Sequence, residues 1–227
     1  MNCLTSACAI FKWWRGALIH VFSIRHGAAS RFAGPGGAGP NDLVVMYVGR
    51  LAAEKNLPDV FRAYSMMRVV QPSAKLVLVG DGPERARLAQ EFPQAIFSGI
   101  RVREHLATQY ASADIFLFPS ITETYGNVTV EAMASGLAVI AYDCAAAKQH
   151  IRHNINGLLA PFDATDDFVK LATALAPDTS RIRAMGAAAR ASAEKMDCKS
   201  ATVNYEQALL VLSTDQTEPL FPANAIA

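Results

Sequence analysis

The sequence predicts an α/β domain of the doubly wound class, with a parallel sheet of about six strands between layers of helices. Short apolar runs alternate along the chain with segments whose apolar residues recur at helical spacing. The runs are continuously apolar, which is typical of strands buried on both faces of a sheet. Parallel strands need crossover connections, and the intervening helices would supply them.

The first strand and helix illustrate the pattern. Residues 43–48 are apolar and rich in β-branched side chains, and the run stops at Gly49. Asn56 offers an N-cap and Pro58 suits the first turn, so a helix is expected to follow. The same alternation predicts the remaining elements: strands at 75–79, 95–98, 114–118, 138–142 and 157–160, and helices at 84–91, 102–111 and 127–135.

After residue 160 the pattern changes to Ala-rich helical segments at 164–176, 181–196 and 200–212, which are expected to close the domain. Glycine and proline dominate residues 33–40 and indicate a linker. We therefore predict that the chain has three parts: a remnant or linker segment at 1–41, an α/β domain at 42–213 and a flexible tail at 214–227.

Composition excludes several classes of protein. The 227 residues carry 21 Lys plus Arg against 20 Asp plus Glu, a net charge of +1, so no nucleic-acid partner is expected. An apolar fraction of 52% is enough for a folded core. The four cysteines are too few and too dispersed for a disulfide framework, and no apolar run reaches the length of a membrane span. A cytoplasmic location is the expectation.

Ligands of doubly wound sheets bind beyond the carboxyl ends of the strands, where loops lead into helices. The loops to search are at residues 49–56, 80–83, 119–127 and 143–150. The loop at 80–83 taken alone predicts a tight turn. None of the loops matches the dinucleotide fingerprint, which disfavours an NAD-dependent oxidoreductase.

The loop at 119–127 is the most informative of the four. It places Glu123 after a strand and Glu131 one turn inside the next helix. The backbone amides of Gly126, Asn127 and Val128 would lie at the amino end of that helix, which favours an anion. Carboxylates accept hydrogen bonds from sugar hydroxyls, so the segment could hold a sugar phosphate. The alternative is a solvated Glu123 and a helix-face Glu131, although Glu131 lies among apolar residues.

Two cations stand in the loop at 49–56. Arg50 follows the strand directly, and Lys55 precedes the helix. Arginine makes forked hydrogen bonds to phosphate and lysine acts as a point charge, a combination suited to a diphosphate leaving group. The alternative is a surface arginine beside a Glu54–Lys55 neighbour pair.

Four segments in this order carry a family resemblance. They are Val48-Gly49-Arg50 with Glu54-Lys55-Asn56, Val79-Gly80-Asp81-Gly82-Pro83, Tyr110-Ala111-Ser112-Ala113-Asp114, and Glu123 with Glu131-Ala132-Met133-Ala134-Ser135-Gly136. With these segments the chain resembles the C-terminal, nucleotide-sugar-binding half of family-4 retaining glycosyltransferases with the GT-B fold, a Rossmann-like half-molecule, and is most similar to bacterial mannosyltransferase-like members.

The resemblance implies transfer of a hexose, with retention, from a GDP- or UDP-linked donor to a lipid or glycan acceptor. It implies that Arg50 and Lys55 hold the donor diphosphate and that Glu123 faces the donor sugar. By the same carry-over Glu131 binds ribose hydroxyls, and the amides of residues 126–128 meet the phosphates. No cofactor beyond the donor, and no metal, is implied.

Two departures from the family pattern bear on function. Family members have an acceptor-binding α/β domain before the donor half, where this chain has only its segment 1–41, so a partner chain or a homo-oligomer is expected to supply the acceptor half. The alternative is a binding module without turnover, or a truncated remnant. Residues 143–148 replace the usual paired glycines. Trp13 and Trp14 between two cations suit peripheral membrane contact, with a short buried or disordered remnant as the alternative.

Overall fold

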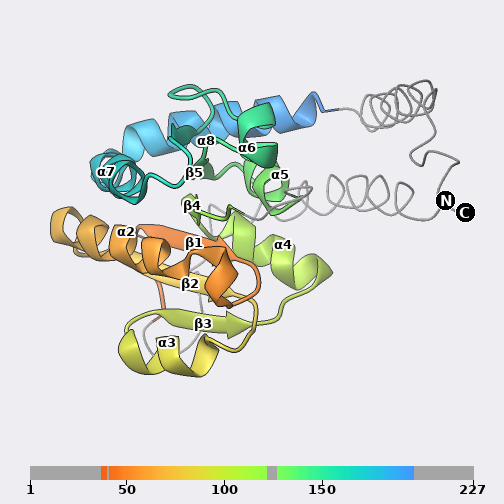
Figure 1. Cartoon of the computed structure of the whole chain (residues 1–227). Coiled ribbons are helices and arrows are strands. Elements are labelled where there is room, and N and C mark those ends of the chain that lie inside the picture. The colour runs from red at the N-terminus through yellow and green to blue at the C-terminus, as the bar shows by residue number, and fades with distance from the viewer. Residues whose placement is uncertain (1–36, 40, 122–126, 197–227) are drawn as a thin grey trace, which may run out of the picture. The chain divides into compact units, whose positions relative to one another are not determined.

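The computed structural model describes residues 37–39, 41–121 and 127–196 (Figure 1). Trp13, Trp14, the expected helix at 200–212 and the expected tail at 214–227 lie outside the described residues. Within them, six parallel strands form one sheet in the order β3-β2-β1-β4-β5-β6. The predicted doubly wound α/β class and its six strands are confirmed.

The strands coincide with the predicted apolar runs to within one or two residues. Those at residues 44–48, 115–118 and 138–142 are buried throughout because helices cover both faces of the sheet, whereas the edge strand at 96–99 is half-buried along its length. The strands are β1 (Val44–Val48), β2 (Lys75–Val79), β3 (Ile96–Gly99), β4 (Ile115–Phe118), β5 (Ala138–Tyr142) and β6 (Leu158–Ala160).

The helices follow the strands as predicted, with one correction. The loop expected at 143–150 contains a short helix, in which Ala146 and Ala147 favour the helical conformation. The helices are α2 (Leu57–Val70), α3 (Arg85–Glu91), α4 (Arg103–Ala111), α5 (Asn127–Ala134), α6 (Ala145–His150), α7 (Thr165–Leu175) and α8 (Thr179–Glu194), with a 3₁₀ turn η2 at Ala53–Lys55.

The start of α2 differs from the sequence prediction in detail. Asn56 occupies the N-cap position, but its side chain makes no capping hydrogen bond. Its backbone is left-handed, with φ of 49°, because the preceding turn η2 ends at this residue. Asparagine tolerates this conformation better than most residues, so its role here is to join two helical turns.

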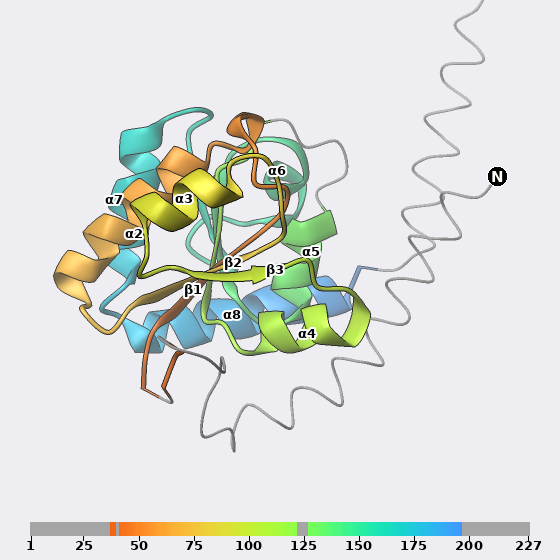
Figure 2. The ribbon, with the colours of Figure 1, turned by 90° about the horizontal axis from the view of Figure 1, so that it is seen from below.

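The helices cover the sheet in two layers. Figure 2 shows α2 and α3 on one face of the sheet and α4 and α8 on the other. The helix α7 packs against α2, and α8 packs against α5, so the last two helices complete the two layers. No helix among the described residues is both long enough and apolar enough to cross a bilayer.

Strand order changes direction between β1 and β4. From β1 the chain proceeds outward to β2 and β3, and it then crosses back to place β4 on the other side of β1. The register pairs Val45 with Ile115 and Met46 with Phe116. Loops leaving the carboxyl ends of these two strands therefore diverge onto opposite faces, which opens the crevice where ligands of doubly wound sheets bind.

Candidate donor-binding site at the sheet's carboxyl edge

The loops that carry the predicted chemistry begin at adjacent strands. Arg50 and Lys55 follow β1, whereas Asn127, Val128 and Glu131 belong to α5, which follows β4. Because β1 and β4 are neighbours in the sheet, these two groups start on either side of the crevice. Glu123 and Gly126 lie outside the described residues.

The loop after β1 is attached along its length to the loop after β2. The amide of Gly49 donates to the carbonyl of Val79 at 3.0 Å, and the amide of Leu51 donates to the carbonyl of Asp81 at 2.9 Å. These bonds extend the β1–β2 ladder beyond the last paired residues, Val48 and Val79. The backbone that carries Arg50 is consequently held by a neighbouring segment.

Two glycines permit this close approach. A Cβ atom on Gly82 would lie 2.3 Å from the carbonyl oxygen of Leu51, and one on Gly80 would meet Gly49 in the same way. The sequence indicated only a tight turn at residues 80–83. The structure shows that this turn supports the cation-bearing loop, a role that becomes visible only when β1 and β2 are known to be neighbours.

Arg50 is accessible to a ligand. Its side chain is 67% exposed, and its guanidinium lies 3.6 Å from a carboxylate oxygen of Glu54. An exposed ion pair of this kind contributes little to stability and is readily exchanged for a stronger anion. The surface pairing considered as the alternative therefore exists, but between Arg50 and Glu54. Lys55 closes η2 and is half-buried.

Glu131 is largely buried in the structure. Its Oε2 atom accepts a hydrogen bond of 3.1 Å from the hydroxyl of Tyr110, on α4. Burial raises the pKa of Glu131 to about 7, while the Tyr110 hydrogen bond lowers it. The helix-face charge considered as the alternative is therefore partly buried and hydrogen-bonded rather than solvated. The sequence analysis did not propose Tyr110 as a site residue. Its contact with Glu131 joins two different helices, and the sequence alone does not show which helices lie side by side.

Asn127 and Val128 begin α5, as predicted for the anion-facing stretch. Asn127 is exposed and Val128 is half-buried. The first amides of a helix have no partner within the helix, so these residues present donors and the positive end of the helix dipole. The structure places them one turn before Glu131 on the same helix.

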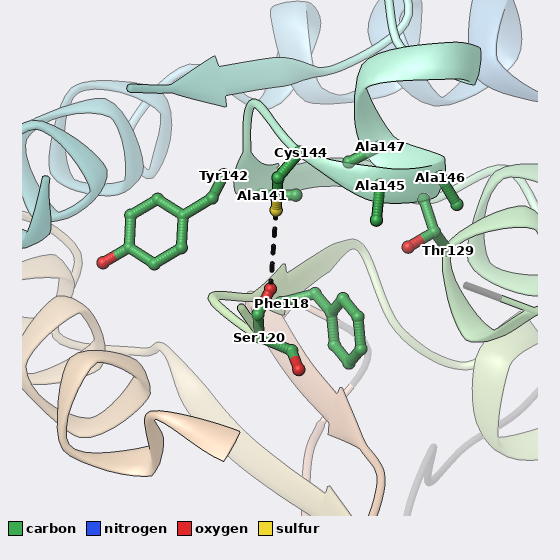
Figure 3. Close-up of a pocket in the computed structure, with 9 residues that line it drawn as sticks. All are labelled: Phe118, Ser120, Thr129, Ala141, Tyr142, Cys144, Ala145, Ala146 and Ala147. Carbon is green, nitrogen blue, oxygen red and sulfur yellow. Dashed lines mark hydrogen bonds between the residues drawn. The ribbon is translucent and has the colours of Figure 1, made fainter. Parts of the chain in front are cut away.

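A small hollow lies between the ends of β4 and β5 (Figure 3). Thr129 of α5 and the alanines at the start of α6 face it, and the thiol of Cys144 points toward the carbonyl of Ser120 at 3.8 Å. Ser120 and residues 144–147 lie in two of the loops that the sequence analysis selected, although none of the lining residues was proposed as a site residue. The lining residues are Phe118, Ser120, Thr129, Ala141, Tyr142, Cys144, Ala145, Ala146 and Ala147.

The segment at 143–148, where the family resemblance leads one to expect paired glycines, contains one alanine with a left-handed backbone. Ala145 has φ of 45°, a left-handed conformation that costs an alanine about 1–2 kcal/mol. Its methyl group lies beside the hollow. Across the described parts of the chain, no cluster of His, Cys, Asp and Glu side chains is arranged to bind a metal ion.

The geometry suits an anionic ligand with hydroxyl groups. One wall carries an exposed arginine and a lysine, and the other carries helix amides and a buried carboxylate. Cations and amides favour phosphate, and a carboxylate accepts hydrogen bonds from hydroxyls.

Known proteins with similar sequences are named as sugar transferases. A GDP-mannose-dependent alpha-mannosyltransferase of Mycobacterium tuberculosis is 38% identical over 154 residues, covering 67% of this chain and 38% of the relative. A sulfoquinovosyl transferase of Arabidopsis thaliana is 35% identical over 169 residues, covering 72% and 32%. The chain thus spans about a third to two fifths of the length of these curated relatives.

Solved structures share the fold. Staphylococcus aureus TarM superposes with a TM-score of 0.65 at 18% identity over 75% of this chain and 36% of its own. Anabaena HepE, in complex with UDP and glucose, gives a TM-score of 0.60 at 23% identity over 77% and 49%. These likenesses confirm the expected Rossmann-like half of a GT-B fold.

The match to a protein family covers the sheet and both walls of the site. The family described as Glycosyl transferases group 1 matches residues 42–178, more than half of the chain. This range includes β1 with its cation-bearing loop and α5 with Glu131. The chain therefore belongs to the family of Glycosyl transferases group 1.

Proposed function

We propose that this chain is the donor-binding half of a retaining hexosyltransferase, which takes a sugar from a GDP- or UDP-linked donor and transfers it to a lipid or glycan acceptor. The observation that carries the proposal is the position of the two walls. Arg50 and Lys55 leave β1, and the helix with Glu131 follows β4, on either side of the change in strand order. Both sequence relatives described above are named as sugar transferases.

The residues divide the donor between them. Arg50 and Lys55 hold the diphosphate, together with the amides of Gly126, Asn127 and Val128 at the amino end of α5. Glu131 accepts hydrogen bonds from the ribose, and Glu123 faces the transferred sugar. The donor is a substrate, so the reaction needs no further organic cofactor.

In the proposed reaction the acceptor hydroxyl oxygen bonds to the anomeric carbon on the face that the diphosphate leaves. The bond between the anomeric carbon and the diphosphate oxygen breaks, and its electron pair stays on the diphosphate. A phosphate oxygen takes the proton of the acceptor hydroxyl. Negative charge grows on the leaving group, where prearranged cations and amides give the most assistance.

We further propose that a second domain, on another chain or another copy of this one, covers the carboxyl edge of the sheet and binds the acceptor. The curated relatives are longer than the matched region, which supports this proposal. Transfer then requires both halves, whereas donor binding requires only this chain.

Calorimetric titration of the full chain with GDP-mannose and UDP-glucose tests donor binding. Arg50→Ala is expected to weaken binding at least tenfold, the loss of about 1.4 kcal/mol from one charge-assisted contact. Arg68→Ala is the matched control, because Arg68 lies in the last turn of α2, at the opposite edge of the sheet, and stacks over Tyr64. Equal effects of the two variants, or no binding by the unaltered chain, would refute the assignment.

Turnover is tested by adding the acceptor-binding half of a relative in trans. Product is expected only in the mixture, and the anomeric configuration of the product, read by NMR, should match that of the donor. An inverted product would exclude retention. Donor binding without product under all combinations would support a binding module instead.

A further inference from the structure

Tyr110 is fully buried between the sheet and α5. Its ring packs beside Phe116 of β4, with centroids 5.9 Å apart, and its hydroxyl lies 3.1 Å from Oε2 of Glu131. The same hydroxyl lies 3.5 Å from the carbonyl oxygen of Val128, in the first turn of α5. The hydroxyl of Tyr110 thus contacts both Glu131, the residue proposed to bind the ribose, and the first turn of α5, where the proposed anion site begins.

We propose that Tyr110 is a positioning residue for donor binding. Its hydroxyl holds one carboxylate oxygen of Glu131 and thereby keeps the other oxygen ionised and oriented toward the ribose hydroxyls. This inference rests on the proposed function, since it assumes that Glu131 accepts hydrogen bonds from the donor.

The electrostatics of the pair support this role. Burial, reinforced by the neighbouring carboxylate, raises the pKa of Tyr110 well above its usual value, so the phenol remains a donor at every physiological pH. Glu131, in contrast, has a pKa of about 7 because burial disfavours its charged form. Its ionisation near neutral pH therefore depends on the one hydrogen bond that favours the carboxylate.

Other charged groups do not provide this stabilisation among the described residues. Burial and the Tyr110 hydrogen bond are the causes of the pKa of Glu131, with no contribution from a charged side chain of α4, α6, α8 or β5. Ser135 donates to the backbone carbonyl of Glu131 at 2.8 Å and does not contact the carboxylate. Tyr110 is consequently the side chain whose removal should change the titration of Glu131.

The proposed role of Tyr110 makes donor affinity depend on pH. An ionised carboxylate accepts hydrogen bonds at both oxygens, whereas a protonated carboxyl carries a hydrogen that competes for the same partners. Donor affinity should therefore fall as pH falls through the pKa of Glu131. Without the Tyr110 hydroxyl this pKa rises, so the loss of affinity should begin at higher pH.

The test is the affinity of the full chain for GDP and UDP between pH 5.5 and 9, measured for the unaltered chain, Tyr110→Phe and Tyr64→Phe. In Tyr110→Phe the pH midpoint is expected to rise by about one unit, which gives roughly fivefold weaker binding at pH 7 and near-normal binding at pH 9. Tyr64 is the matched control, because its hydroxyl is also buried and donates to Ala74 at 3.2 Å, at the opposite edge of the sheet.

Several results would overturn the proposal. A Tyr110→Phe curve parallel to that of the unaltered chain, whether weaker or unchanged, would assign the tyrosine a structural role alone. Glu131→Gln should abolish the pH dependence of nucleotide affinity. The double variant Glu131→Gln, Tyr110→Phe should likewise show no pH dependence. If the unaltered chain bound neither GDP nor UDP even at pH 9, the proposed function itself would fail.

A second measurement covers the case in which Tyr110→Phe does not fold. The hydroxyl proton of Tyr110 in the unaltered chain should shift in NMR spectra with the same midpoint as donor binding. That shift should be absent in Glu131→Gln. A hydroxyl signal that ignores pH would contradict the proposed coupling.

Discussion

A Cβ atom placed on Gly80 would lie 1.9 Å from the carbonyl oxygen of Gly49. Such a distance is far inside any allowed contact. The oxygen belongs to the backbone and a Cβ atom is bonded directly to the backbone, so neither can yield without moving a loop. The loop after β2 therefore determines where the loop after β1, and with it Arg50, can lie.

We predict that Gly80→Ala destabilises the domain by about 2–4 kcal/mol, because the substitution adds a backbone clash to an unfavourable φ of +139°. Donor affinity should also fall, since the clash displaces the backbone of Arg50. Gly99→Ala is the control, for Gly99 also has a positive φ of +70° but no atom within 4 Å of an added Cβ. Denaturant unfolding of the control should show a loss of only about 1 kcal/mol.

The ion pair between Arg50 and Glu54 predicts a competition with the donor. Glu54→Gln should strengthen donor binding about two- to fivefold at low salt, because the arginine no longer has to leave a carboxylate. The gain should shrink as salt is added. Glu91→Gln makes the same charge change at the far end of α3 and should leave affinity unchanged. A gain of equal size in both variants would point to net charge rather than to the Arg50 contact.

We predict that replacing Ala145 by glycine stabilises the domain. Its φ of 45° is strained for alanine, so Ala145→Gly should relieve about 1–2 kcal/mol of strain. The greater freedom of glycine in the unfolded chain offsets part of this gain, leaving about 0.5 kcal/mol. Ala147→Gly, inside α6, should instead destabilise by about 0.5–1 kcal/mol. Thermal unfolding of the two variants should shift in opposite directions; shifts of the same sign would contradict the prediction.

Glu131 predicts a conflict between stability and binding that depends on pH. Its folded-state pKa of about 7 exceeds the ordinary value of 4.5 for a glutamate, so its contribution to stability is fully present below pH 4.5 and is lost as pH rises through 7. The free energy of unfolding of Glu131→Gln, taken relative to that of the unaltered chain, should therefore be about 2–3 kcal/mol more favourable to the folded state at pH 8 than at pH 5.

Urea unfolding at both pH values measures this difference, and donor titration at pH 8 should show weaker binding by the same variant. A constant difference in unfolding free energy at the two pH values would mean that the carboxylate has an ordinary pKa. Asp42→Asn is a suitable control for the general effect of neutralising a carboxylate, because Asp42 contacts the Gly39 amide, in the segment preceding β1.

The local pattern of apolar residues is sufficient to predict most strands and helices of this fold. Runs such as residues 44–48 are buried on both faces, and so they are apolar throughout and can be recognised without knowing their neighbours. The helix at 145–150 was missed because it is a single short element that follows a strand directly. Asn56 was assigned a capping side chain because its residue type favours one, whereas the adjoining 3₁₀ turn imposed a different backbone.

The site divides in the same way. Residue types and chain order pointed to Arg50, Lys55 and Glu131, since cations and carboxylates at strand ends carry their chemistry in their own side chains. The contact between Tyr110 and Glu131, and that between Gly80 and Gly49, join segments that the chain order separates. Their existence depends on which strands are adjacent and how closely the layers pack, and those distances arise from the folding of the whole sheet rather than from any local stretch of sequence.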